Sequence, residues 1–560
     1  MDHIQKRHVS VGLGCLLAAL PIWSQDSMTP APLGDLALPP NAASKSVEAP
    51  ELQITRQLQP TQPASLRIQT SNIAISGVQS LPFEEIAAYF QPLSGKEVSL
   101  EQLVHATALA TQRYQEAGYP LSFVYLPDQS FQNGLVQVIA VEGYTTQVQV
   151  SGDMGKSADL LQAMAQPLLE EKPLRRSTFE RQTLLMSRME NLKVVASAAM
   201  PTTTDGGTPL QLQIDRQPVL FNVGAEVKQG DSKAMGTLTL NDPLWGGSQW
   251  QFTSILDKPS RERFIATSLR QWITPDGTQL RASYSDFKGQ DNFGNVSLDD
   301  ITHQRRLELN VSHPLLLSNQ RSAILGASLF GVNYAKNYRY PDLGLDINDR
   351  EKVRAVQLQW NGHLSQTRTH HQAQLSFTQG IDGMGAGLAR DNNLNLPMQL
   401  NPAKLDFSRL AMDYSVRHRL ENLVGMALGI GGQYSPHALP VTERVSFGAT
   451  RYGRGYRAGE AAGDRGLGIS LEVNRSFAQP QSTWFKTIEP YLMYEDAKTW
   501  FETSGLLSQR LRSSSIGIRL SDSRYYYVDL TASKPHGDRS PYNPSQKMRY
   551  SLSLNYNLDP

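Results

Sequence analysis

The sequence has almost no cysteine: its 560 residues include one, Cys15. A framework of disulfides therefore cannot hold this chain together. The formal net charge is +1, which gives no signal for binding nucleic acid. No stretch approaches about 18 consecutive apolar residues, so we expect no membrane-spanning helix. If the protein resides in a membrane, it must cross it as a closed β-barrel.

Motifs for catalysis or cofactor binding are also missing. There is no P-loop, and the glycines of Gly383–Gly387 follow a strand pattern without opening a helix, unlike a dinucleotide-binding turn. His363, His370 and His371 flank a predicted short turn, and we predict no metal site there. We expect no enzyme activity, no cofactor and no nucleotide hydrolysis by this chain.

The first 24 residues have the pattern of a secretory leader. Lys6 and Arg7 precede an apolar run over Val9–Ile22, and Ser24 stands at the expected cleavage point. Cys15 lies too early in that run for a lipoprotein signal. Residues 25–66 are rich in Pro, Ala, Ser and Gln with little periodicity, which predicts a linker. We expect the mature chain to leave the cytoplasm.

Residues 67–143 have the pattern of a compact unit in the order strand, helix, helix, strand, strand. Apolar residues recur at helical spacing over Phe83–Phe90 and Leu100–Ala117, and the runs Leu121–Leu126 and Leu135–Val141 predict strands. Residues 144–217 repeat this order, which indicates a tandem duplication. An unrelated small α+β domain is the alternative for the first unit.

Residues 218–560 have a different pattern, in which apolar and polar residues alternate over segments of about ten residues. Tyr550, Leu552 and Leu554, for example, alternate with serine and asparagine. We count about 16 such segments, with strands near residues 219, 236, 248, 263, 278, 301, 321, 353, 370, 405, 424, 467, 486, 511, 525 and 548.

A soluble β-sandwich would show the same alternation. The leader, the strand length, the aromatic residues near strand ends and the long polar loops favour an outer-membrane barrel instead. We therefore predict two α+β units, each in the order β-α-α-β-β, followed by an all-β, antiparallel transmembrane β-barrel.

A long irregular segment, residues 440–466, precedes the predicted twelfth barrel strand. Its stretch Ser446–Gly466 is rich in glycine and arginine, and a segment of this kind needs a scaffold to hold one conformation. Residues 467–473 then alternate between apolar and polar, so the segment leads into a strand. An ordinary surface loop is the alternative.

Two groups of residues resemble the two-partner secretion transporters of the ShlB/FhaC/HecB haemolysin secretion/activation type, in the outer-membrane translocase and insertase superfamily. Arg454, Gly455 and Tyr456, between Phe447-Gly448 and Gly463-Asp464, resemble the sixth outer loop of that family. The first α+β unit resembles its first polypeptide-transport-associated (POTRA) domain in Tyr114, Gly118, Tyr119, Pro120, Ser122, Leu126, Pro127, Gln129, Gly134, Glu142 and Gly143.

The resemblance implies the outer membrane of a Gram-negative bacterium, with two POTRA domains in the periplasm. Residues 25–66 would then hold a plug helix, or only a linker. With the POTRA domains in the periplasm, residues 440–466 fall between the eleventh and twelfth strands and become the sixth outer loop. The resemblance implies that this loop folds back into the barrel lumen.

The resemblance also implies which residues hold the loop. The family clamps its arginine with an acidic residue of the thirteenth strand, and alternation over Glu489–Asp496 points Glu495 toward the lumen. We predict an ion pair between Arg454 and Glu495, with Asp496 as the second choice. Solvated loop-end acids are the alternative. Supporting roles in loop packing are expected for Gly455, Tyr456 and Asp464.

The POTRA units are predicted to bind a client. Their second strand and adjoining helix leave a sheet edge and a groove, to which an unfolded polypeptide can add a strand. These strands are Leu121–Leu126 and Val194–Ala199. The predicted client-binding residues of the first unit are Tyr119, Leu121, Ser122, Val124, Leu126, Pro127 and Gln129. A spacer role is the alternative.

The resemblance finally implies a function. We expect a monomeric transporter that captures an unfolded, β-rich exoprotein with an N-terminal secretion domain and secretes it through the lumen. Outer-membrane lipid and the barrel assembly machinery are further expected partners, and nucleic acid is not. A barrel-assembly insertase and a diffusion porin are the alternatives. The chain ends in Leu558-Asp559-Pro560, without the terminal aromatic residue usual in such barrels, and we expect Tyr556 to serve in its place.

Overall fold

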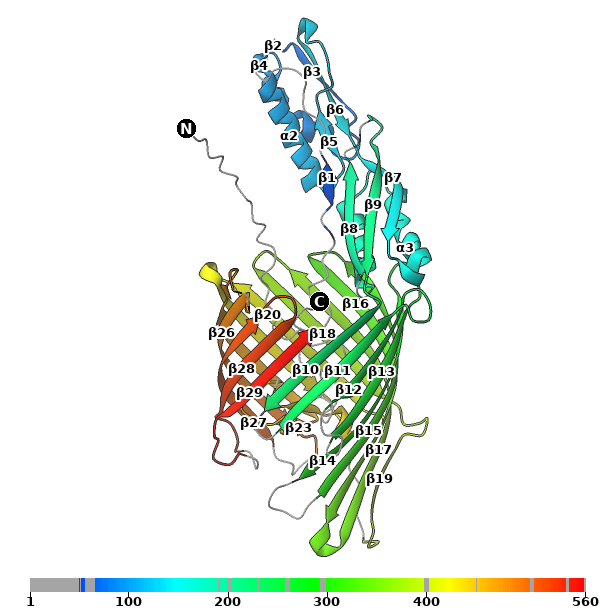
Figure 1. Cartoon of the computed structure of the whole chain (residues 1–560), viewed down its shortest axis with the longest axis vertical. Helices are drawn as coiled ribbons and strands as arrows, with labels where there is room; N and C mark the ends of the chain where they lie inside the picture. The colour runs from blue at the N-terminus through cyan, green and yellow to red at the C-terminus, as the bar shows by residue number, and fades with distance from the viewer. Residues whose placement is uncertain are drawn as a thin grey trace.

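The computed structural model describes residues 50, 52–55, 66–189, 192–199, 201, 203–228, 231–256, 262–292, 299–396, 402–449, 451–482, 484–503, 508–539 and 543–557. Two α+β units lie end to end beyond one rim of a β-barrel (Figure 1). The predicted leader, Cys15, most of the predicted linker or plug segment, and residues 558–560 lie outside the described residues. Among those described, no helix has the length and apolar character needed to span a membrane.

The first unit packs a long helix on a three-stranded sheet of order β3-β6-β5. Strand β3 (Asn72–Ser76) runs parallel to β6 (Leu135–Val141), and β5 (Phe123–Tyr125) runs antiparallel to it. The helix α2 (Leu100–Glu116) buries apolar residues on one face against this sheet. The smaller elements are α1 (Phe83–Ala87) and the paired strands β2 (Arg67–Gln69) and β4 (Glu97–Ser99).

Glu142, at the end of β6, joins the sheet to the last turn of α2. Its carboxylate accepts the backbone N–H groups of Gln79 and Ser80 at 2.8 and 2.7 Å, and the Tyr114 hydroxyl at 3.0 Å. Burial, with the nearby Glu142 carboxylate, raises the pKa of Tyr114. The phenol therefore stays protonated, and its O–H remains the donor of the hydrogen bond to Glu142.

The second unit repeats the plan with a four-stranded sheet of order β1-β8-β9-β7. Strand β9 (Gly207–Arg216) pairs with β7 (Tyr144–Gly152) in parallel and with β8 (Leu192–Ala199) in antiparallel orientation. The fourth strand is β1 (Gln53–Thr55), a short piece of the predicted linker. The helices are α3 (Ala158–Ala165), α4 (Pro167–Glu170) and α5 (Arg176–Arg188).

The two units share a packed junction. Leu121 of the first unit is buried in the hydrophobic core of the second. The Arg176 N–H donates to the Gly118 carbonyl at 2.7 Å, and the Leu174 N–H donates to the Gly143 carbonyl at 3.0 Å. The units therefore meet through core packing and backbone hydrogen bonds, and not through a free linker.

The barrel is a closed antiparallel sheet in which the last strand pairs with the first, Val223 lying opposite Tyr556. Eighteen described segments form sixteen barrel strands, because β19 continues β18 along β17 and β25 continues β24 along β26. They are β10 (Val219–Lys228), β11 (Asp231–Asn241), β12 (Ser248–Ile255), β13 (Glu262–Trp272), β14 (Gln279–Asn292), β15 (Asp299–Leu317), β16 (Arg321–Tyr340), β17 (Leu345–Ser365), β18 (Thr369–Gly380), β19 (Gly387–Asn392), β20 (Ser408–Arg419), β21 (Val424–Tyr434), β24 (Arg465–Arg475), β25 (Phe477–Ala478), β26 (Thr487–Trp500), β27 (Gln509–Ser521), β28 (Tyr526–Pro535) and β29 (Arg549–Asn557).

Each of the predicted strand segments corresponds to one barrel strand, and the predicted fold class is confirmed. Apolar residues of the alternating pattern lie on the outer face, where Leu307, Leu471 and Leu492 are 63%, 52% and 60% exposed. In a β-sandwich such residues would be buried between two sheets. The closed barrel with its apolar outer face excludes that alternative.

Strands β15, β16 and β17 are 19, 20 and 21 residues long, whereas the other full strands have 8 to 14. Together with the end of β14 and with β19, they extend past the rest of the barrel at the end opposite the α+β units (Figure 1). Cross-strand ion pairs join this extension, among them Arg339 with Asp346 and Arg350 with Asp391.

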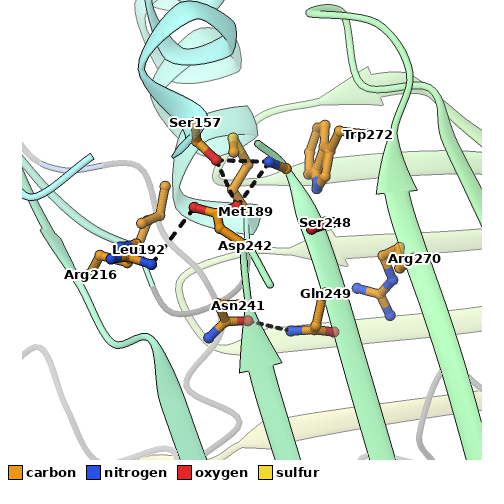
Figure 2. Close-up of a pocket in the computed structure, with 11 residues that line it drawn as sticks. Ser157, Met189, Leu192, Arg216, Asn241, Asp242, Ser248, Gln249, Arg270 and Trp272 are labelled. Carbon is orange, nitrogen blue, oxygen red and sulfur yellow. Dashed lines mark hydrogen bonds and ion pairs between the residues drawn. The ribbon is translucent and has the colours of Figure 1, made fainter. Parts of the chain in front are cut away.

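The second unit sits on the barrel rim through a hydrogen-bonded cluster around Asp242 (Figure 2). Asp242 Oδ1 accepts the Ser157 hydroxyl at 2.8 Å and the Gly247 N–H at 2.9 Å, while Arg216 lies 3.9 Å from its other oxygen. Trp272 of β13 belongs to the core of the second unit. The cluster surrounds a small cavity, and it fixes the second unit to the turn between β11 and β12.

Candidate functional site

The segment between β21 and β24 folds into the barrel. It contains the short strands β22 (Val445–Phe447) and β23 (Ala461–Gly463), which pair with each other and form a narrow hairpin. Phe447, Tyr452 and Tyr456 are buried together with Ala497 of β26 and Leu511 of β27. An ordinary surface loop would not bury three aromatic residues against the barrel wall, so that alternative is wrong. We call residues 440–466 the inward loop.

Glycine is required at the tip of the inward loop. A Cβ on Gly455 would lie 2.8 Å from the backbone nitrogen of Pro535 in β28. Gly448 has φ +123°, and a Cβ there would lie 2.0 Å from the Arg457 carbonyl oxygen. The first glycine allows close approach to the wall and the second allows a turn within the loop.

Arg454 contacts the inner wall through both its backbone and its side chain. Its N–H donates to Glu495 Oε2 at 2.8 Å, and Glu495 is 2% exposed. The guanidinium donates to the Tyr491 hydroxyl at 2.8 Å and lies 3.8 Å from the Asp529 carboxylate. We call Tyr491, Asp529 and Thr531 the arginine seat.

This geometry corrects the predicted ion pair between Arg454 and Glu495. Glu495 Oε2 already accepts the Arg454 backbone N–H and the Ser513 hydroxyl, the latter at 2.9 Å. The guanidinium extends past Glu495 to Tyr491 on the same strand and to Asp529 on β28. Glu495 therefore anchors the main chain of the loop, and Asp529 supplies the nearest described carboxylate to the guanidinium.

Asp496, the second predicted partner, makes no described contact with the loop. Its carboxylate pairs with Arg510 at 2.6 Å and lies 3.9 Å from Arg512. The side chains of a strand alternate between faces, so the residue after an inward Glu495 must point outward. The prediction for Asp496 is wrong for this reason.

Tyr456 holds the tip of the loop, and Asp464 holds its two ends together. The Tyr456 hydroxyl accepts the Gly537 N–H at 2.7 Å, and its carbonyl accepts from Arg549 of the closing strand β29. Asp464 is 1% exposed and accepts the N–H groups of Leu439 and Glu502 at 2.9 and 2.8 Å. Tyr456 thus contacts the wall near the barrel seam, and Asp464 joins the start of the loop to its end.

A second anchor of the loop was missed by the sequence analysis. Leu439, the residue directly before the loop, is fully buried among inward-facing Phe330, Val332, Val353, Ala355 and Phe407. Close by, Glu443 pairs with Arg409 of β20 at 3.3 Å, and the Val441 N–H donates to Glu351 of β17 at 2.7 Å. The loop is therefore attached to the β16–β20 wall as well as to the β26–β28 wall.

Tyr491 and Asp529 were also missed, although a signal was present. Tyr491 lies on the same face of β26 as Glu489 and Glu495, and Asp529 lies on the face of β28 that carries buried Tyr527 and Thr531. Alternation alone identifies both as inward. That the arginine reaches them depends on where the loop tip enters, which the sequence pattern does not encode.

The predicted client-binding residues of the first unit are mostly buried. Leu121, Ser122 and Val124 are 1%, 1% and 4% exposed. The edge of β5 is partly covered, because the Thr111 hydroxyl of α2 accepts the Val124 N–H at 2.9 Å. The hydroxyl donates to the Thr107 carbonyl at 2.8 Å, and the Val124 carbonyl lies 3.3 Å from it. These three side chains cannot contact a client directly, so their prediction is corrected.

The other predicted client-binding residues lie nearer the surface. The Gln129 side chain takes the place of a paired strand, accepting the Gln137 N–H at 2.7 Å and donating to the Gln137 carbonyl at 2.9 Å. Pro127 precedes it, Leu126 packs partly buried on the core, and Tyr119 packs edge-on against Tyr114. These residues close the end of the β5–β6 edge.

The corresponding strand of the second unit, β8, is already bound by an extended segment. Gln53, Ile54 and Thr55 of β1 pair in parallel with Ser197, Ala198 and Ala199. This sheet edge therefore accepts an extended polypeptide with backbone hydrogen bonds.

Two family models match the chain. Residues 68–143 match the POTRA domain of ShlB type, and residues 277–520 match the haemolysin secretion/activation protein ShlB/FhaC/HecB. The outer membrane transporter CdiB of Dickeya dadantii (strain 3937) is 21% identical over 405 residues, 67% of this chain and 66% of that protein. The chain thus spans slightly less than two thirds of that relative. The heme/hemopexin transporter protein HuxB of Haemophilus influenzae is 21% identical over 511 residues, 85% of this chain and 84% of its own.

Solved structures share the fold. CdiB from Escherichia coli matches with a TM-score of 0.61 at 18% identity, covering 91% of this chain and 94% of that one. BamA from Haemophilus ducreyi lacking POTRA domains 1–3 matches with a TM-score of 0.54 at 14% identity, covering 88% of this chain and 100% of that one. The POTRA match, the barrel match and the inward loop agree: the chain belongs to the ShlB/FhaC/HecB haemolysin secretion/activation family, with its barrel in the outer membrane and its POTRA domains in the periplasm.

Proposed function

We propose that this protein exports an unfolded exoprotein from the periplasm through the barrel lumen, and that the inward loop controls the passage. The observation that carries the proposal is the attachment of Arg454 inside the barrel, to Glu495 through its backbone and to the arginine seat through its side chain. A loop fixed to two opposite parts of the wall crosses the lumen, so a client must pass beside it or displace it.

Client capture is proposed to occur on the POTRA units. The edge of β8 supports this step, because it binds an extended segment of this chain, β1, through backbone pairing. A client strand that displaces β1 from this edge would gain the same main-chain hydrogen bonds without a required sequence. We therefore place capture on β8 of the second unit, and not on the buried residues of β5.

The relatives support a protein cargo in general. CdiB and HuxB are both named as transporters, and HuxB as a transporter of heme/hemopexin. We propose a secreted, β-rich exoprotein as the cargo here. Its folding outside the cell would withdraw unfolded chain from the lumen by mass action, and no nucleotide is then needed.

The test is secretion by the Arg454→Gln variant. The variant should insert into the outer membrane at wild-type amounts, because the barrel pairing does not involve the loop, yet lose secretion of the exoprotein that the wild type exports. Arg457→Gln is the matched control in the same loop, since that side chain is exposed. Wild-type secretion by Arg454→Gln contradicts the proposal.

Two other functions share parts of this architecture. If the protein is an insertase, its depletion should leave other outer-membrane barrels under-assembled. The fold that it shares with BamA makes this depletion experiment necessary. A diffusion porin would keep its conductance unchanged when residues 447–466 are deleted. Either result favours that function over exoprotein export.

A further inference from the structure

Arg519 of β27 is the largest fully buried side chain of the described residues. Its guanidinium donates to both carboxylate oxygens of Glu472 in β24, each at 2.7 Å, and to Glu489 of β26 at 2.8 Å. A guanidinium buried in this way is compensated by its carboxylates, and removing it leaves their charges unpaired. The cluster is therefore a fixed part of the wall.

The same guanidinium also contacts the arginine seat. Arg519 lies over the Tyr491 ring at 4.0 Å from its centroid, and its Nε is 3.8 Å from Asp529. The Tyr491 hydroxyl in turn donates to Asp529 at 2.9 Å and is 2.6 Å from the Thr531 hydroxyl. Arg454 thus contacts two groups that Arg519 also contacts.

The two arginines occupy different places around one ring. Arg519 is 4.0 Å and Arg454 5.7 Å from the Tyr491 centroid, and each is 3.8 Å from the Asp529 carboxylate. A cation near an aromatic face and a bidentate carboxylate both restrict the ring and the guanidinium to one geometry. Lysine at position 519 would keep the charge but lose the planar fork.

We propose that Arg519 is a positioning residue for the inward loop: it fixes Tyr491 and Asp529 in the arrangement that receives Arg454. The cluster of Arg519, Glu472 and Glu489 in the wall then sets how firmly the loop tip is held. Arg519 itself makes no described hydrogen bond or ion pair with the loop. The consequence for secretion rests on the proposed function, but the effect on the loop tip does not.

A disulfide reports the position of the tip directly. The Cβ that Gly453 lacks would lie 3.3 Å from the Leu511 Cβ, close to the separation of about 3.5–4.5 Å in disulfides. The pair Gly453→Cys and Leu511→Cys is made with Cys15→Ser, so that no other cysteine remains. Gly453 has φ +131°, so a cysteine there strains the tip, and rates are compared only between proteins that all carry this pair. The rate of disulfide formation is measured in outer-membrane vesicles with the full chain.

Arg519→Gln should lower the rate of disulfide formation by about tenfold or more, because Tyr491 and Asp529 lose the guanidinium that fixes them. Arg454→Gln should lower the rate as much, because it removes the side chain that the seat holds. The double variant should be no slower than either single one, because both act on one contact. Arg519→Lys should still fold, which its heat-modifiable migration in gel electrophoresis would show. It should nevertheless form the disulfide slowly.

Arg306→Gln is the matched control. Arg306 binds Glu308 with two hydrogen bonds of 3.0 and 2.8 Å and lies 4.1 Å from the Phe330 ring, on the opposite wall. It should leave the disulfide rate unchanged. If Arg519→Gln fails to fold, Glu472→Gln replaces it and should give the same loss, because Glu472 holds Arg519 with both oxygens and makes no described hydrogen bond or ion pair with Arg454.

A wild-type disulfide rate in Arg519→Gln, an equal loss in Arg306→Gln, or additive losses in the double variant would overturn the proposal. The two proposals fail differently. Normal secretion by Arg454→Gln, with a disulfide rate that still depends on Arg519, rejects the proposed function and keeps this inference.

Discussion

Tyr491 lies directly opposite Gly517 in the antiparallel pair of β26 and β27, and a Cβ on Gly517 would lie 2.3 Å from Cζ of the tyrosine ring. The ring therefore occupies the space that the missing side chain leaves. Because the Tyr491 hydroxyl receives Arg454, a glycine of one strand determines where the loop arginine binds.

Gly517→Ala should displace the Tyr491 ring and weaken the attachment of the loop tip. Overpacking of this kind costs about 1–3 kcal/mol. We expect larger and more frequent conductance steps in planar bilayers than for the wild type. Gly326→Ala is the control, because its Cβ would meet no described atom closer than 3.5 Å. Equal conductance of the two variants would contradict the prediction.

Leu439→Ala should release the second anchor of the loop. Leu439 is fully buried on the β16–β20 wall, and removing such a side chain costs about 2–5 kcal/mol. Hydrogen exchange followed by mass spectrometry should show faster exchange over residues 436–447, with little change at β29. Slower or unchanged exchange in that segment would show that the apolar contacts do not hold it.

Asp242→Ala should loosen the second POTRA unit from the barrel rim. The carboxylate is buried and holds Ser157 and the Gly247 N–H, so its loss leaves buried donors unpaired at about 1–3 kcal/mol. Limited proteolysis should cut sooner between the unit and β10. Asp153→Ala is the control, since Asp153 binds the same Arg216 but its side chain is 54% exposed. Cleavage at the wild-type rate in Asp242→Ala would show that the cluster does not hold the second unit on the barrel rim.

Thr111→Val should expose the edge of β5 without changing the volume of the side chain much. The Val124 N–H would lose the hydroxyl that now accepts it, at about 1–2 kcal/mol. The amide of Val124 should exchange faster in the full chain. Unchanged protection of that amide would mean that the helix covers the edge without the hydroxyl.

The sequence predicted the barrel well because a lipid environment imposes a simple rule. Every second residue of a strand must be apolar, and residues such as Leu471 and Leu492 keep to this over whole segments. Arg454 was found through a motif. Its side-chain partners were not, because Tyr491 and Asp529 come from different strands and only the depth of the loop brings them together.

Other misses have local causes. β1 is three residues long within a segment rich in proline and glutamine, so no period is visible. Leu121 and Ser122 were assigned to an open groove because their burial comes from the neighbouring unit and from Gly143, whose N–H donates to the Ser122 hydroxyl at 3.1 Å. Contacts between units leave no trace in the periodicity of either one.

The length of β16 and β17 has a consequence for the cell surface. About 9–11 residues of a tilted strand cross the lipid, so roughly half of each of these strands stands in the surrounding medium. The turn at Pro341–Leu343 is then the outermost tip of a stiff, charge-paired ribbon. Whatever approaches the bacterium, whether antibody, phage or neighbouring cell, meets this ribbon before it meets the mouth of the pore.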